Sequence, residues 1–128
     1  MNITEDYVSF EVAKLLKEKG FDEGCSFVVN AISKGVMPVS WPTTNSDIED
    51  EKASLIALPT LQMARKWLRE KYNIHIEVVH LNVDRHTYYL YRYYSCQSER
   101  YVQHTNPEYS TYEEACEAAI KYCLENFI

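Results

Sequence analysis

The sequence predicts an α+β domain, in which an antiparallel sheet of three to five strands carries two helices packed on one face. The first observation behind this prediction is the stretch Ile74–Ser95, which is rich in the β-branched and aromatic residues that favour strands. The second is that residues 59–73 and 110–128 repeat apolar residues with helical spacing. The core therefore has the predicted order helix-strand-strand-strand-helix across residues 59–128.

The stretch Ile74–Ser95 is predicted to form a β-hairpin around the two-residue turn Asp84-Arg85. In this register Glu77 faces Arg92, so an ion pair supports the alignment, and Val79 faces Leu90. One face then carries Ile74, Ile76, Val78, Tyr89, Tyr91 and Tyr93. The other face carries Val79, Leu81, Tyr88 and Leu90. A solvated face would alternate to polar residues, so this second face is expected to be covered by residues 1–58 or by another chain.

Two helices are predicted to flank the hairpin. The first begins at Pro59 or Thr60. Its buried stripe holds Leu61, Ala64, Leu68 and Tyr72, and a second apolar flank holds Met63 and Trp67. The second helix begins at Ser110 or Thr111, each followed three residues later by the glutamate of a capping box. Its stripe is formed by Tyr112, Ala115, Cys116, Ala119, Cys123 and Phe127. A short strand is predicted over residues 100–105, where Asn106-Pro107 ends it.

The acidic residues 1–58 are predicted to be a smaller attachment within one domain of residues 1–128. Ser9 caps a helix that ends at Gly20, and a strand follows over residues 25–32. A second strand follows Gly35 and is confined to a sheet edge by Pro38, which has no amide hydrogen to donate.

Residues 40–58 give the weakest pattern in the chain. They open with turn-forming residues, pass through an acidic run and end in the apolar patch Leu55-Ile56. We expect a solvated loop with a short helix near its end. Trp41, near the start of this loop, is expected to pack on the core.

Charge and composition exclude several classes of protein. The net charge is −6, and residues 1–58 hold ten acidic residues against five lysines, so the chain lacks the basic footprint of a general nucleic-acid binder. No run approaches the roughly 20 apolar residues of a membrane span, and the first ten residues lack the basic start of a secretory signal. A cytoplasmic location is expected, in which the four cysteines are reduced thiols.

Function is predicted to be non-catalytic. Eleven tyrosines, five of them between Tyr88 and Tyr94, suit a binding surface, because a tyrosine combines a large apolar ring with a polar tip. The expected role is that of an interaction or accessory module that binds a protein partner or forms a homodimer. The surface expected to carry this role consists of Met63, Trp67, Val79, Leu81, Tyr88 and Leu90.

Catalytic and metal-binding patterns are absent from the sequence. The four histidines and four cysteines show no CxxC or HxxxH spacing, so no metal and no cofactor are expected. Among the possible combinations of a nucleophile with a general base, Cys96 with His75 is the least implausible. No phosphate-binding glycine loop is present, and the chain holds three glycines in all.

The alternative function is nucleic-acid binding through the basic residues Arg65, Lys66 and Arg69. The element order of residues 59–126 resembles that of double-stranded-RNA-binding domains, which implies recognition of A-form RNA by shape. Those domains begin their second helix with a lysine cluster, whereas this chain has Glu113, Glu114 and Glu117 at that place.

Two further resemblances bear on function. The segment of residues 110–125, STYEEACEAAIKYCLE, resembles the helix of small HicB-type antitoxins. The chain lacks the glycine-rich strand motif of that family. That likeness implies an antitoxin-like regulator. The segments PTLQMARKWLREKYNIHI and EEACEAAIKYCLEN resemble small uncharacterised proteins of prophages and mobile elements of gut bacteria. This second resemblance implies an accessory protein and supplies no catalytic residues to transfer.

Overall fold

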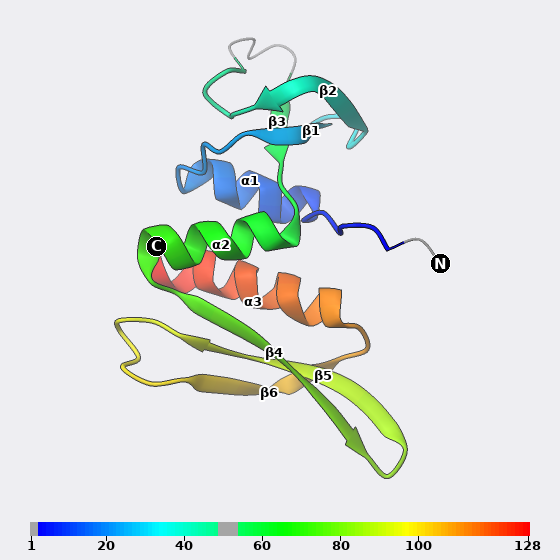
Figure 1. The fold of residues 1–128 in the computed structure, drawn as a ribbon, viewed down its shortest axis with the longest axis vertical. Coiled ribbons are helices and arrows are strands. Elements are labelled where there is room, and N and C mark those ends of the chain that lie inside the picture. Colours follow the sequence, from blue (N-terminus) through cyan, green and yellow to red (C-terminus); the bar gives the residue numbers. More distant parts are fainter. Residues whose placement is uncertain (1–2, 49–53) are drawn as a thin grey trace. The chain divides into compact units, whose positions relative to one another are not determined.

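The computed structural model of this chain describes residues 3–48 and 54–128. The chain divides into two units, residues 1–62 and residues 63–128. Each unit has a three-stranded antiparallel sheet, and the described residues form three helices, so the predicted α+β class is confirmed (Figure 1). The expected single sheet of three to five strands is wrong, because the strands of the first unit pair with one another in a separate sheet.

The N-terminal unit contains α1 (Phe10–Glu18), β1 (Cys25–Asn30), β2 (Val36–Thr43) and β3 (Leu55–Leu58), with sheet order β2-β1-β3. The predicted helix start is confirmed, because the Ser9 hydroxyl accepts a hydrogen bond from the backbone N–H of Val12 at 3.3 Å. Gly20 follows the helix with φ of 94°, a conformation that favours glycine. Strand β2 lies at a sheet edge, as its proline predicts.

Two expectations for residues 40–58 are wrong. Residues 55–58 form strand β3, which pairs with β1, where a short helix was expected. A short apolar run fits a buried strand and a buried helical turn equally well, and the pairing partner decides between them. Trp41, expected to pack on the core, is 76% exposed on β2. Residues 49–53 of the expected loop lie outside the described residues.

The C-terminal unit is built from α2 (Leu61–Tyr72), β4 (His75–Val83), β5 (His86–Tyr94), β6 (Val102–Tyr109) and α3 (Tyr112–Phe127). Helix α2 begins two residues before the unit does. The predicted order helix-strand-strand-strand-helix is confirmed, and the sheet order is β4-β5-β6. The hairpin register is also confirmed, since Glu77 pairs with Arg92 and Val79 with Leu90. Asp84 and Arg85 have φ of 50° and 67°, the left-handed conformation that a two-residue hairpin turn requires.

Strand β6 is longer than predicted. Asn106-Pro107 was expected to end it, yet the strand continues to Tyr109. The pairing with β5 shifts at this point, from Tyr91↔His104 to Tyr89↔Tyr109, so the four residues 105–108 form a bulge opposite Leu90. The proline is tolerated because β6 is an edge strand, where one side of the backbone has no neighbour to bond.

Helix α3 provides the core of the C-terminal unit. Thr111 is its N-cap, with a hydroxyl that accepts from the N–H of Glu114 at 3.1 Å. The helix contacts all three strands and lies along one face of their sheet (Figure 1). Four of its buried residues are alanine or cysteine, which let the helix approach the sheet closely. The buried set is Ala115, Cys116, Ala119, Ile120, Cys123 and Leu124.

Helix α2 is tied to this layer by Arg65. One terminal nitrogen of its guanidinium donates to the Tyr112 hydroxyl of α3 at 2.7 Å. The other donates to the backbone carbonyl of Ile76 on β4, also at 2.7 Å. Arg65 therefore fixes α2 to α3 and to the first strand of the sheet.

Candidate interaction surface

The sheet β4–β5–β6 has two faces with different surroundings. The face toward α3 holds the side chains of Ile76, Tyr91 and Tyr93, all of them buried. Tyr93 lies against Phe127 of α3, with ring centroids 5.1 Å apart. On β4 and β5 the residues that alternate with these point to the other face. We call that second surface the open face, defined by Glu77, Val79, Leu81, Val83, His86, Tyr88, Leu90, Arg92 and Tyr94.

The face toward α3 is an aromatic core. The Tyr91 hydroxyl and Nδ1 of His104 are hydrogen-bonded at 2.8 Å, and the ring of Tyr122 on α3 lies 4.5 Å from that of His104. Burial raises the pKa of Tyr91 and lowers the pKa of His104, so both groups are held neutral. Burial also raises the pKa of Tyr93 to about 12. These tyrosines stabilise the fold, which leaves the open face as the candidate binding surface.

The open face is apolar at its centre. Val79, Leu81 and Tyr88, three of the residues predicted for the interaction surface, lie there half-buried. Val83, which sequence reasoning missed, lies beside them and is 53% exposed. It shares the odd-numbered spacing of Val79 and Leu81, so strict alternation along the strand could have found it.

Leu90 lies on this face but is 3% exposed. The bulge of residues 105–108 lies opposite it in the ladder. From that bulge, Glu108 reaches His86 on the open face, with Oε2 and Nε2 3.1 Å apart. The bulge therefore flanks Leu90. Because Leu90 is buried, it offers a partner little area for contact.

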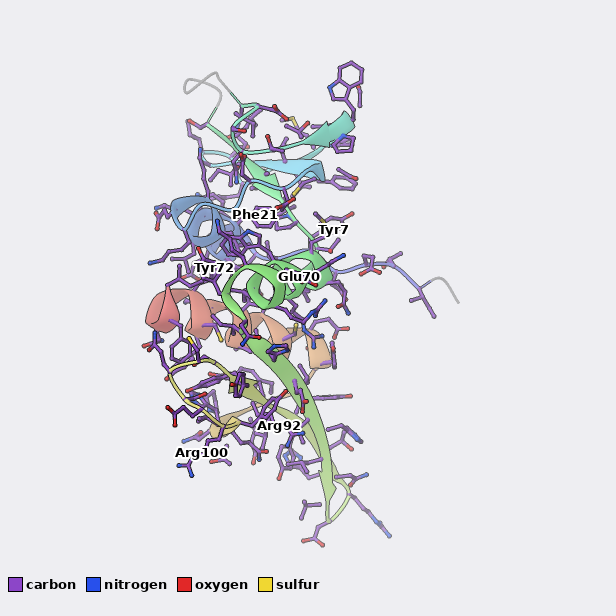
Figure 2. The ribbon with its side chains drawn as sticks, turned by 60° about the vertical axis from the view of Figure 1, so that its left-hand side comes forward. Tyr7, Phe21, Glu70, Tyr72, Arg92 and Arg100 are labelled. Atoms are coloured by element: carbon purple, nitrogen blue, oxygen red, sulfur yellow. The ribbon has the colours of Figure 1, made fainter. Side chains whose placement is uncertain are left out.

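Polar and aromatic groups border the apolar centre toward the start of β4. Glu77 and Arg92 form the predicted ion pair, in which Nε of Arg92 donates to the carboxylate at 2.5 Å (Arg92 is labelled in Figure 2). The Arg92 guanidinium also lies 5.2 Å from the ring centroid of Tyr101, which is 45% exposed. Tyr101 lies just before β6, next to Val102, which pairs with Tyr93 of the other face. Sequence reasoning missed it, although Tyr101 falls within the predicted strand 100–105, whose alternation could have placed it on the open face.

Met63 and Trp67 lie apart from the open face. Both are on α2; Met63 is half-buried and Trp67 is 6% exposed. The Trp67 ring packs edge-on against Tyr72 at 5.2 Å, and the ammonium of Lys71 lies 5.3 Å from it. The surface predicted from six residues is thus divided: Val79, Leu81 and Tyr88 lie half-buried on the hairpin, and Met63 lies half-buried on α2.

The basic residues proposed for nucleic acid differ in their surroundings. Arg65 uses both terminal nitrogens for contacts within the unit. Lys66 is exposed, and Arg69 lies near Glu70 at 3.9 Å with 45% of its side chain exposed. Two of the three cations are therefore available to a ligand. Nucleic-acid binding stays a prediction.

A small pocket opens where α2 meets the start of β4. It is lined by Arg65, Arg69, Ile74, His75, Ile76, Glu77 and Tyr101. Glu77 is paired with Arg92, and the two arginines of the pocket are Arg65, which is bonded within the unit, and Arg69, which lies 3.9 Å from Glu70. The pocket borders the open face, since Glu77 belongs to both.

The cysteines and histidines form no assembled reactive site. Cys25, Cys116 and Cys123 are buried, while Cys96 is exposed. Burial raises the pKa of Cys123 to about 12, which keeps that thiol unreactive. His75, the proposed base for Cys96, has its Nε2 hydrogen-bonded to Asn73 at 2.8 Å. Within residues 3–48 and 54–128, no group of three or more histidines, cysteines or acids is placed to hold a metal ion.

The geometry therefore defines an α+β chain whose C-terminal sheet presents an open apolar and aromatic face. No protein-family model, curated protein or solved structure matches the chain. None of the helices in the described part of the chain has both the length and the apolar character needed to cross a membrane.

Proposed function

We propose that this chain is a non-catalytic interaction module that binds a protein partner through the open face of β4 and β5. The observation that carries the proposal is the row of apolar and aromatic side chains on the side of the sheet turned away from α3. Val79, Leu81 and Tyr88 are half-buried and Val83 is 53% exposed. Exposed apolar patches rimmed by polar residues are typical of interaction sites.

The composition of the rim supports a protein as the partner. Tyrosine and arginine are enriched where proteins bind one another, and Tyr94, Tyr101 and Arg92 border the apolar centre. The Glu77–Arg92 pair leaves this rim without strong charge of one sign. A nucleic-acid surface would instead require a cluster of unpaired cations over the tyrosines.

Leu81→Glu is expected to abolish partner binding while the fold persists. Leu81 is at the centre of the patch, so a partner would have to desolvate the new carboxylate, and capture should fall at least about tenfold. The measurement is co-purification of the tagged chain from its native cells, alongside thermal unfolding. Ile32→Glu is the matched control, because Ile32 is 79% exposed in the other unit. Equal capture by wild type and a folded Leu81→Glu chain would refute the proposal.

A further inference from the structure

The two ends of the open face differ in charge. At one end lies the pocket that contains Arg65 and Arg69. Arg65 already donates to Tyr112 and Ile76, while 45% of the Arg69 side chain is exposed. Arg69, whose Nε lies 3.9 Å from the exposed Glu70 carboxylate, is therefore the cation that this end offers to a ligand, and an incoming carboxylate would compete with Glu70 for it.

The opposite end is the hairpin tip. Its turn carries Asp84 and Arg85, and Glu108 lies beside it through the bond to His86. Within the part of the chain that the structure describes, Asp84 makes no ion pair. The Glu108 carboxylate is hydrogen-bonded to His86, so the exposed Asp84 is the carboxylate that the tip offers to a cation.

The apolar centre lies midway between these two ends. Ile76 lines the pocket and Asp84 forms the tip, so the midpoint along the chain is His80, between Val79 and Leu81 of the open face. Each end lies four residues from that midpoint, or about 13 Å at the rise of a strand. A two-fold axis through the midpoint would bring the pocket with Arg69 of one chain onto the hairpin tip with Asp84 of another. It would also place the apolar centre of each on that of the other.

We infer that the partner of the open face is a second copy of this chain, docked face to face with its β4 strand running in the opposite direction. In this homodimer Asp84 of each copy enters the pocket beside Arg69 of the other. The inference rests on the proposed function and adds the identity of the partner. In a two-fold interface both copies use the same surface, so the open face must be complementary to itself.

The open face is small for a dimer interface. Strands β4 and β5 have nine residues each, so the face is about 30 Å long, and three strands make it about 14 Å wide. The resulting area of about 400 Å² per copy is below the roughly 800 Å² of a standard stable interface. The dimer therefore belongs to the weak, transient class of interface, and its two charge contacts should weaken as salt rises.

Charge reversal tests the docking directly. Arg69→Glu and Asp84→Lys should each abolish dimerisation, because each places like charges at both contacts of the homodimer. An equimolar mixture of the two variants should dimerise again, since every contact in the heterodimer then joins opposite charges. Sedimentation velocity from about 10 µM to about 500 µM covers the range that this small interface implies. Asp84→Asn controls for the turn, because asparagine also tolerates the left-handed conformation.

Recovery in the mixture cannot arise from misfolding of either variant, so it would establish the paired contacts. A wild-type chain that stays monomeric throughout the concentration range would overturn the inference of a second copy. So would dimers of all variants with unchanged affinity. Loss of a different partner on Leu81→Glu, with a monomeric wild type, would reject the second copy and leave the proposed function standing.

Discussion

Replacing Ile120 by alanine should lower the free energy of unfolding of the C-terminal unit by about 3 kcal/mol, within the range for removing a large buried aliphatic side chain. Ile120 is fully buried on α3, and its neighbours on the buried stripe are as inaccessible as it is. The close packing of alanine and cysteine around it leaves little freedom to fill the cavity. The loss should therefore include a cavity term as well as the transfer of the side chain.

The measurement is urea unfolding followed by the fluorescence of Trp67, which belongs to the C-terminal unit and is buried. Trp41 is 76% exposed in the other unit, so Trp41→Phe in every variant removes its signal. Glu125→Ala on the same helix is the control, because Glu125 is exposed and its truncation should change stability by less than about 0.5 kcal/mol. Similar losses from both variants would contradict the placement of Ile120 in the core.

Arg65→Gln should lower the free energy of unfolding by about 2 kcal/mol, as expected for losing hydrogen bonds made by a charged group. The substitution removes the bonds that Arg65 donates to Tyr112 and to the carbonyl of Ile76. The Ile76 carbonyl is on the edge strand β4, so without Arg65 this carbonyl has no donor and the edge of the sheet is more exposed. The same unfolding measurement checks the result.

Lys66→Gln provides the comparison for Arg65→Gln. Lys66 is the next residue on α2 and is exposed, so its substitution should leave stability nearly unchanged. If both variants unfold at the wild-type urea concentration, Arg65 is not the link between α2, α3 and β4. A structural role for Arg65 would also mean that nucleic-acid binding through α2 depends on Lys66 and Arg69.

The hairpin could be predicted from the sequence because two independent constraints agree on its register. Strand alternation separates Ile76 from Glu77, and the charges of Glu77 and Arg92 select the alignment. Strand β3 could not be predicted, since Leu55–Leu58 is too short to show a period and its partner β1 lies far away in the sequence. The bulge of β6 depends in the same way on pairing with β5.

The candidate site was predictable to the extent that it follows strand alternation. Alternation placed Val79, Leu81 and Tyr88 on one face, and the structure places them there. It could not show that the β6 bulge flanks Leu90, or that the Arg92 guanidinium lies against the Tyr101 ring. Helical spacing placed Trp67 on a second flank of α2, but its burial depends on packing that the spacing does not describe.

The most direct test of the open face is site-specific photo-crosslinking in the native cells. A photoreactive phenylalanine analogue would replace Tyr88 on the open face or, as a control of the same residue type, Tyr7, which is 39% exposed in the N-terminal unit. Binding through the open face predicts a discrete protein adduct from position 88 and none from position 7. Absence of a protein adduct at position 88, or the same adduct at both positions, would contradict it.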